Sequence, residues 1–260
     1  MSPPKPSRPP TSPRPPAPNN PAAERLQKLL AAAGLGSRRE IERWIEAGRV
    51  RVGQRVARLG DRAQPGDSIF LDEKILEIGK SNAKPRLIAY HKPVGELVTR
   101  SDPGGRPTVF ARLPELRSGR WIAIGRLDLN SSGLLLFTDS GGLANRLMHP
   151  RGEIEREYAV RVQGGLSEEA IRRLVSGIEL KEGPARFLQL ELIREKRDTG
   201  TNRWYRAVLA EGRNREVRRL VEAVGARVSR LVRVRFGAIL LPRDLPPGRW
   251  IEIDPAVNIC

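Results

Sequence analysis

Residues 121–133 read Trp-Ile-Ala-Ile-Gly-Arg-Leu-Asp-Leu-Asn-Ser-Ser-Gly, four apolar residues that lead into a polar, turn-forming run. The apolar part predicts a short buried strand, and Asp128 follows its end. A strand end positions a carboxylate while the adjoining loop leaves it accessible, so Asp128 is a candidate reactive group. The alternative is that Asp128 serves only in a turn, because aspartate before such a run is ordinary turn chemistry.

The segments around this stretch alternate irregularly between strand and helix patterns. This alternation favours an α+β domain over a doubly wound parallel sheet. The expected strands are residues 86–90, 121–124, 134–138, 158–162, 187–193, 204–210 and 228–236. The expected helices are residues 140–148, 167–176 and 215–224. We expect this domain to span residues 86–254, after a linker at 79–85 and before a C-terminal tail at 255–260.

The segment 211–225 predicts a helix with one inward-facing arginine. Asn214 is a suitable N-cap and Gly225 a suitable C-terminal stop. Helical phase places Arg218 beside the apolar stripe and puts Arg215 and Arg219 on the opposite side. The stripe consists of Val217, Leu220, Val221 and Val224. An inward guanidinium requires an anion, which an active-site carboxylate or some other buried acid could supply.

Composition restricts the class of partner. The chain has 260 residues, 39% of them hydrophobic, and a net charge of +17, which favours a polyanion such as nucleic acid, with an anionic membrane as the alternative. No apolar run approaches the roughly 18 residues of a transmembrane helix, and no apolar signal core begins the chain. Cys260 is the single cysteine, and His91 and His149 lie far apart, so neither a disulfide nor a metal site is expected. These features fit the cytoplasm.

The N-terminal part predicts a basic tail followed by a small RNA-binding module. Residues 1–21 contain ten prolines and no acid, which is typical of a disordered tail. Residues 22–78 contain a helix near 26–33, a second helix capped by Ser37 and Glu40, and a basic hairpin at 49–58. The arginines predicted to face outward, and so to bind RNA or simply to be solvated, are Arg38, Arg39, Arg43, Arg49 and Arg51.

Residues 24–71, with their Ser-Arg-Arg-Glu helix and basic hairpin, resemble the S4 RNA-binding module. Over about residues 24–254 the chain as a whole resembles pseudouridine synthases of the ribosomal small-subunit-A family. The resemblance rests on the stretches 91–95, 105–110, 125–128 with 133–139, 156–160 and 211–220. It implies a catalytic domain with a mixed, largely antiparallel sheet, preceded by a small S4-like α/β module, and isomerisation of uridine in ribosomal RNA without a cofactor or metal.

The resemblance also implies roles for individual residues. Asp128 matches the essential aspartate, acting as nucleophile or base, and Arg218 matches its basic partner. Tyr158 matches the tyrosine that stacks on the base, although a core aromatic on a strand is the alternative. Val217 matches a small residue lining the pocket. Arg126 matches an arginine that enters the RNA helix as the nucleotide flips out.

The resemblance implies a target in 23S ribosomal RNA, and we expect a monomer although the sequence leaves the oligomeric state open. A non-catalytic ribosomal RNA-binding or assembly protein is the main alternative, since the S4-like module and the charge of +17 would suffice for it. A nucleic-acid glycosylase that releases the base is a second, weaker alternative. The joint presence of Asp128, Tyr158 and Arg218 favours the synthase, because a binding module has no need to combine them.

Overall fold

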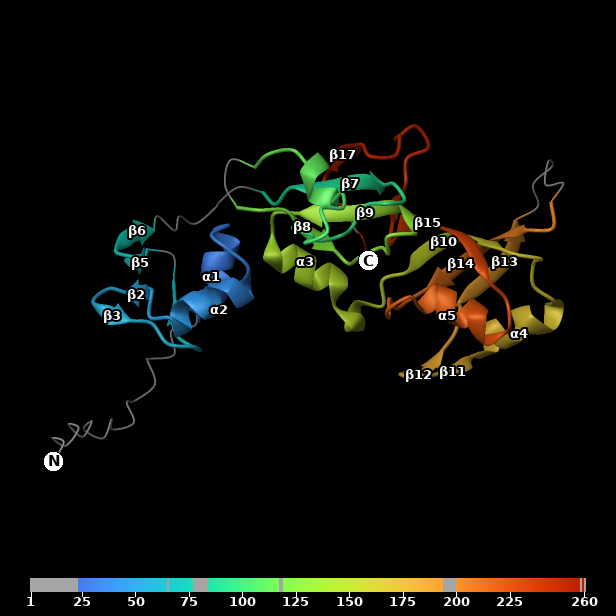
Figure 1. Ribbon diagram of the computed structural model, residues 1–260, viewed down its shortest axis with the longest axis horizontal. Helices are drawn as coiled ribbons and strands as arrows, with labels where there is room; N and C mark the ends of the chain where they lie inside the picture. Colours follow the sequence, from blue (N-terminus) through green and yellow to red (C-terminus); the bar gives the residue numbers. More distant parts are fainter. Residues whose placement is uncertain are drawn as a thin grey trace, which may run out of the picture. The chain divides into compact units, whose positions relative to one another are not determined.

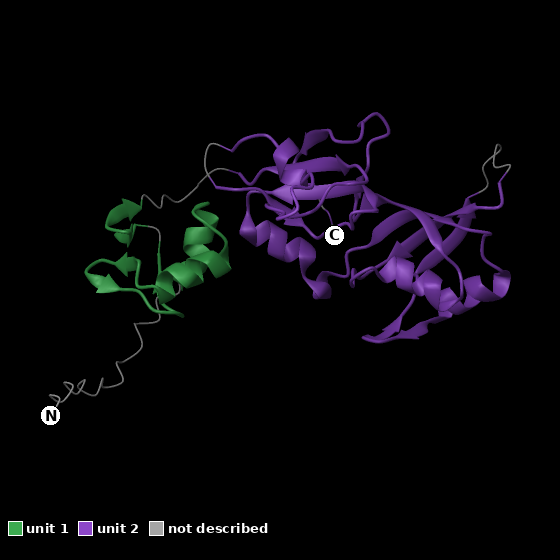
Figure 2. Cartoon of the chain, in the orientation of Figure 1, with its two compact units in different colours: residues 1–81 green, residues 82–260 purple. Residues whose placement is uncertain are grey.

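The computed structural model describes residues 23–64, 66–76, 84–116, 119–193, 200–257 and 259. The chain divides into two compact units, residues 1–81 and residues 82–260 (Figure 2). The expected basic tail at 1–21 and residues 79–83 of the expected linker lie outside the described residues.

The helices of the first unit form where the sequence predicts them. They are α1 (Leu26–Ala32) and α2 (Arg38–Glu46). The Ser37 hydroxyl accepts a hydrogen bond from the Glu40 amide, and the Glu40 carboxylate accepts one from the Ser37 amide, both at 3.1 Å. This confirms the predicted capping box, which satisfies two amides at the start of α2. Leu26 and Ile41 are fully buried in the core between the helices and the sheet.

The first unit also contains a four-stranded antiparallel sheet in the order β3-β2-β5-β6. Its strands are β2 (Val50–Val52), β3 (Arg55–Val56), β5 (Ile69–Leu71) and β6 (Lys74–Leu76), and β1 (Glu24–Arg25) pairs separately with β4 (Arg62–Ala63). The predicted hairpin corresponds to β2 and β3. Strands β5 and β6 were not predicted, because runs of three residues carry little periodicity.

A nine-stranded sheet forms the framework of the second unit (Figure 1). The main path runs β13-β14-β10-β15-β9-β7-β17, with β16 paired to β15 and β8 paired to β9. The strands are β7 (Leu87–Lys92), β8 (Ile122–Ile124), β9 (Ser132–Thr138), β10 (Arg156–Val162), β13 (Gln189–Ile193), β14 (Arg203–Leu209), β15 (Val228–Phe236), β16 (Ile239–Leu240) and β17 (Trp250–Ile253). Among these strands only β15 and β9 pair in parallel, which confirms the mixed, largely antiparallel α+β sheet.

The central strands of this sheet are buried on both faces. Along β7, Ile88 and Tyr90 belong to one core, whereas Leu87 and Ala89 belong to another. The helices α4 (Glu168–Ser176) and α5 (Glu216–Ala223) contribute to the first core, and α3 (Gly141–Met148) contributes to the second. The continuous apolar run in β9 follows from this two-sided burial. Ile259, within the expected tail, is buried in the second core.

Several short elements of the second unit were not predicted. They are the hairpin of β11 (Ile178–Leu180) and β12 (Gly183–Ala185), the strands β16 and β17, and the 3-10 turns η1 (Val109–Arg112) and η2 (Pro150–Gly152). Each is four residues or shorter, so none carries a readable period.

The parallel pair β9–β15 fixes the place of the loop that carries Asp128. Gly133, at the start of β9, pairs with Arg233 of β15 and has φ +105°. A Cβ atom added to Gly133 would lie 2.2 Å from the carbonyl oxygen of Arg233, so no larger residue fits there. This close approach brings the residues that precede β9 against β15 and, through it, β10.

Candidate active site

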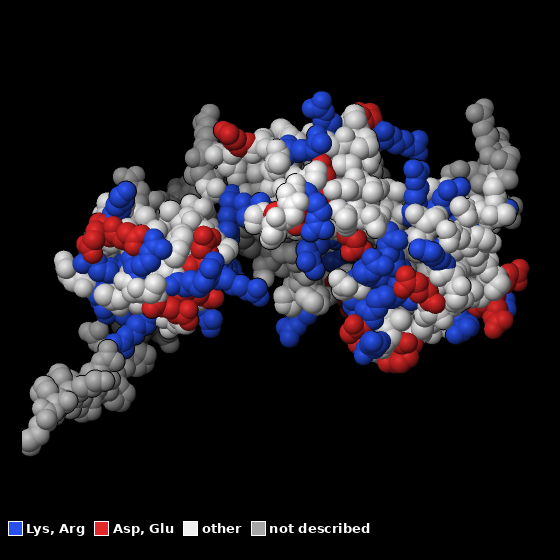
Figure 3. Space-filling model, in the orientation of Figure 1, with Lys and Arg blue, Asp and Glu red and all other residues white. Residues whose placement is uncertain are grey.

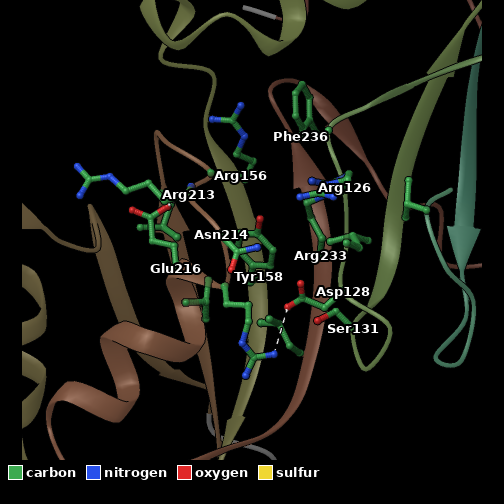
Figure 4. Close-up of a pocket in the computed structure, with 18 of the residues that line it drawn as sticks. Arg126, Asp128, Ser131, Arg156, Tyr158, Arg213, Asn214, Glu216, Arg233 and Phe236 are labelled. Carbon is green, nitrogen blue, oxygen red and sulfur yellow. Dashed lines mark hydrogen bonds and ion pairs between the residues drawn. The ribbon is translucent and has the colours of Figure 1, made fainter. Parts of the chain in front are cut away.

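A cleft of about 1040 Å³ opens in the second unit (Figure 4). Its walls come from the loop after β8, from β10, from β15 and from the loop that precedes α5. Figure 3 shows basic side chains gathered beside β10 and α5. The residues that the sequence singled out and that line this cleft are Arg126, Asp128, Tyr158 and Val217. The fold therefore gathers segments that lie up to about ninety residues apart in the chain.

Asp128 lies between β8 and β9, in a turn closed by the Ser131 amide donating to the Asp128 carbonyl at 3.0 Å. Its carboxylate points into the cleft and is 32% exposed. The predicted position at a strand end is correct, and the residue is both a turn residue and a cleft residue. A rigid turn with a solvent-accessible carboxylate suits a reactive group.

Lys92 fixes this turn from behind. It is fully buried, and its Nζ donates hydrogen bonds to the backbone carbonyls of Pro93, Asp128 and Ser131 at 3.0, 3.0 and 2.8 Å. Burial lowers the pKa of Lys92 to about 8, although Glu96 and Asp128 counteract this effect. The sequence indicated Lys92 only as part of a motif, because two of the three carbonyls that it binds lie 36 and 39 residues away.

Arg218 turns inward from α5, as its helical phase predicts. Its Nε lies 3.9 Å from the Asp128 carboxylate, and Nη2 donates to the Asn130 carbonyl at 3.0 Å and to the Ser131 hydroxyl at 3.4 Å. Burial is the main cause that lowers the pKa of Arg218, the positive charge of Arg215 adds to it, and Asp128 opposes it. Arg218 thus holds the Asp128 turn and places a positive charge beside the carboxylate.

Arg218 alone of the three arginines is buried, as predicted, but a second arginine approaches the acid, which helical phase did not indicate. Nη1 of Arg215 lies 3.8 Å from the same carboxylate oxygen of Asp128. The helix begins at Glu216, and Arg215 precedes it in the left-handed conformation with φ +51°. Helical phase therefore does not describe Arg215. Asn214 is also not the N-cap; instead the Glu216 carboxylate accepts the Arg213 amide at 3.0 Å.

Tyr158 and Val217 belong to both the core and the cleft. Tyr158 is 8% exposed, packs in the first core and opposes Arg233 of β15 across a bulge in the β10–β15 pairing. Val217, in the first turn of α5, is buried as well. Tyr158 thus lines the cleft and also packs in the first core, so its place in the core does not exclude contact with a base. Arg126 is exposed at the cleft (Figure 4).

The loop before α5 and the first residue of α5 add two acids that the sequence did not single out. Glu211 forms an ion pair with Arg213 at 2.7 Å, and Glu216 is buried. Burial, followed by the nearby Glu211, raises the pKa of the Glu216 carboxyl. In the sequence both acids appear only as members of the stretch 211–220 that carries the resemblance.

The arginines of the S4-like unit fall into two groups. Arg38, Arg39 and Arg43 of α2 are exposed and form no ion pair with another described residue. Arg49 binds Asp72 through two hydrogen bonds, and Arg51 binds Glu73 at 2.9 Å. The predicted outward position is correct for Arg38, Arg39, Arg43 and Arg49, whereas Arg51 is half-buried over the Phe70 ring. Arg49 and Arg51 are already paired with acids.

The described residues contain no group of three or more His, Cys, Asp and Glu arranged to hold a metal ion. His91 contacts the Leu245 carbonyl through Nδ1 at 2.7 Å, and His149 accepts the Arg151 amide. Within the same residues, no helix has the length and apolar character needed to cross a membrane.

Comparisons with known proteins agree with this geometry. Residues 86–223 match the family model for RNA pseudouridylate synthase, and residues 24–69 match the S4 domain. Relatives named ribosomal large subunit pseudouridine synthase B include those of Salmonella typhimurium and Escherichia coli K12, each 57% identical over 237 residues. In both cases the match covers 90% of this chain and 80% of the relative.

The relative of the same name from Pseudomonas aeruginosa is 52% identical over 235 residues, covering 90% of this chain and 60% of the relative. A solved pseudouridylate synthase superposes with a TM-score of 0.62 at 23% identity, over 88% of this chain and 96% of that chain, and so supports the fold. The chain belongs to the RNA pseudouridylate synthase family and carries an S4 domain before its catalytic domain.

Proposed function

We propose that this enzyme converts a uridine of large-subunit ribosomal RNA, the 23S molecule, into pseudouridine. The name shared by relatives at 52–57% identity supports this substrate. The observation that carries the chemistry is the position of Asp128, an accessible carboxylate in the cleft with two guanidinium groups within 4 Å.

In the proposed reaction the N1–C1′ bond of a flipped-out uridine breaks and the uracil turns within the cleft. C5 then bonds to C1′, and the proton lost from C5 is balanced by one gained at N1. Asp128 starts the reaction by attacking the sugar or by removing one of its protons, and Arg215 and Arg218 place positive charge beside its carboxylate. Tyr158 stacks on the uracil, and Val217 lines its pocket.

Substrate capture is assigned to the remaining basic residues. Arg126, exposed at the cleft, occupies the stacked position left by the flipped nucleotide. Residues 22–78 bind RNA phosphates through Arg38, Arg39 and Arg43, with smaller contributions from the acid-paired Arg49 and Arg51. Residues 79–85 link this part to the catalytic domain at 86–254. A monomer acting in the cytoplasm is consistent with a cleft built by one chain and with a ribosomal substrate.

The Asp128→Asn variant tests the function. It should bind RNA with nearly the wild-type Kd and form no pseudouridine, measured by nucleoside mass spectrometry and chemical mapping of 23S rRNA from a strain lacking the protein. Asp244→Asn is the matched control, because Asp244 is exposed and lies outside the cleft. Product formation by the Asp128 variant contradicts the proposal. Release of free uracil by the wild type would indicate a glycosylase instead.

A further inference from the structure

Arg156 and Arg233, two arginines of the cleft, both lie over the ring of Phe236 (Figure 4). Arg156 is the first residue of β10. The Cζ atoms of Arg156 and Arg233 lie 5.1 and 5.5 Å from the ring centroid of Phe236, and all three residues line the cleft. Neither arginine takes part in the contacts of Asp128. Their charges therefore call for a separate explanation.

Arg233 is a buried cation without a matching acid. It is 3% exposed, its Nε donates to the Leu134 carbonyl at 2.7 Å, and its Nη2 has no hydrogen-bond partner among the described residues. Burial is the main cause that lowers its pKa. Tyr158 is the group that opposes this effect, through its side chain. A buried guanidinium whose neighbours are a carbonyl, a tyrosine and an aromatic ring, with no carboxylate, is costly unless an anion approaches.

Arg156 is held in place but keeps donors for a ligand. Its Nη1 donates to the carbonyls of Ile154 and Ala210 at 2.8 and 2.7 Å. The Nε and Nη2 donors of the guanidinium group remain for a ligand. Burial is the main cause that lowers the pKa of Arg156 and the charge of Arg233 adds to it, whereas Tyr158, Glu216 and Glu211 oppose it. Both acids make their direct contacts with Arg213, through its side chain and its amide respectively.

We propose that Arg156 and Arg233 form a subsite for a phosphodiester of the RNA backbone next to the flipped uridine. Arg156 contacts the non-bridging oxygens, and Arg233 supplies a second positive charge from behind. Tyr158 lies two residues from Arg156 on β10 and opposite Arg233, which places the subsite beside the base-stacking position. The uracil ring is neutral, so the phosphate is the part of the substrate that two positive charges favour. The inference rests on the proposed function of the same cleft.

The test uses RNA fragments that span a mapped target uridine and carry one neutral methylphosphonate linkage, placed in turn on either side of that uridine. One linkage should lower wild-type kcat/KM by about tenfold or more, the loss expected for a charged hydrogen bond. On unmodified RNA, Arg156→Gln should lower kcat/KM by a comparable factor relative to the wild type. Replacing the same linkage by the neutral one should then lower the kcat/KM of this variant little further. Arg156→Lys should recover part of the activity and part of the sensitivity.

Arg172→Gln is the matched control, because Arg172 is exposed on α4 and pairs within its helix with Glu168. It should keep the full sensitivity to the neutral linkage. If an arginine variant is inactive, its sensitivity to the neutral linkage is measured instead as the change in Kd for the RNA. Both the arginine variant and its reference then carry Asp128→Asn. The same Kd measurement is made for Arg233→Gln after circular dichroism has shown that this variant is folded.

Equal sensitivity of Arg156→Gln and wild type at every linkage overturns the subsite, as does a wild type insensitive to all of them. Failure of the proposed function looks different, because the wild type would then form no pseudouridine in any RNA.

Discussion

Nζ of Lys92 donates a hydrogen bond to the backbone carbonyl of Asp128 at 3.0 Å. The two residues stand 36 positions apart, yet one buried ammonium group holds the turn that presents the carboxylate. A lysine ammonium has three donors, and here each donor has a carbonyl. The orientation of Asp128 thus depends on the protonation state of Lys92.

We predict that activity falls as the pH rises through about 8, the pKa of Lys92 in the folded chain. A neutral amine keeps two donors, so one carbonyl of the turn loses its bond. Stability behaves differently. Because the unfolded lysine titrates near about 10.4, the unfolded state binds more protons between the two values, and the Lys92 contribution to stability increases with pH over that range.

The measurements for this prediction are kcat/KM and urea unfolding between pH 7 and 9. Lys92→Met should lose about tenfold or more in kcat and should lack this alkaline decline, since its carbonyls are unsatisfied at every pH. An identical decline in Lys92→Met would assign the titration to another group.

Arg218 and Arg215 should differ in importance although both lie within 4 Å of Asp128. Arg218 is buried and bonds the turn at Asn130 and Ser131, whereas the Arg215 side chain is 46% exposed. Arg218→Gln should lower single-turnover rates by about a hundredfold and stability by about 1–3 kcal/mol. Arg215→Gln should cost less than about tenfold, since solvent screens its charge. Equal losses would contradict this ranking.

RNA binding should depend on salt through the free arginines of the first unit. Each phosphate contact contributes about 0.7–0.9 to the slope of log K against log salt. The triple change of Arg38, Arg39 and Arg43 to Gln should therefore lower the slope by about 2–3. Changing Arg49 and Arg51 to Gln is the control and should lower it less, because those side chains already bind Asp72 and Glu73. Similar slopes for both variants would show that ion pairing does not restrict these arginines.

Gly133→Ala should be severely destabilising, by about 3 kcal/mol or more, because its Cβ would lie 2.2 Å from the Arg233 carbonyl oxygen. Gly183→Ala is matched in conformation, with φ +101°, but no atom lies within 4 Å of its Cβ. Gly183→Ala should lower the free energy of unfolding by only about 1–2 kcal/mol, because it adds backbone strain without a steric clash. Thermal and urea unfolding compare the two. Similar losses would show that the strands can separate locally.

Local patterns were sufficient for the features that depend on neighbours within a few residues. The Ser37–Glu40 capping box, the place of Asp128 after an apolar strand and the inward phase of Arg218 all follow from spacings along one element. The mixed sheet and the family were also predicted correctly, since several motifs covered most of the chain.

Features that depend on distant pairing could not be obtained in this way. Arg215 reaches Asp128 because its backbone leaves the helical conformation, and Lys92 binds a turn about 40 residues away. Arg156 and Arg233 meet at Phe236 only because β10 pairs with β15, and Gly133 is required only because β9 approaches β15. Periodicity reports the face of one element, whereas these contacts depend on the packing of several elements, which no single stretch of residues encodes.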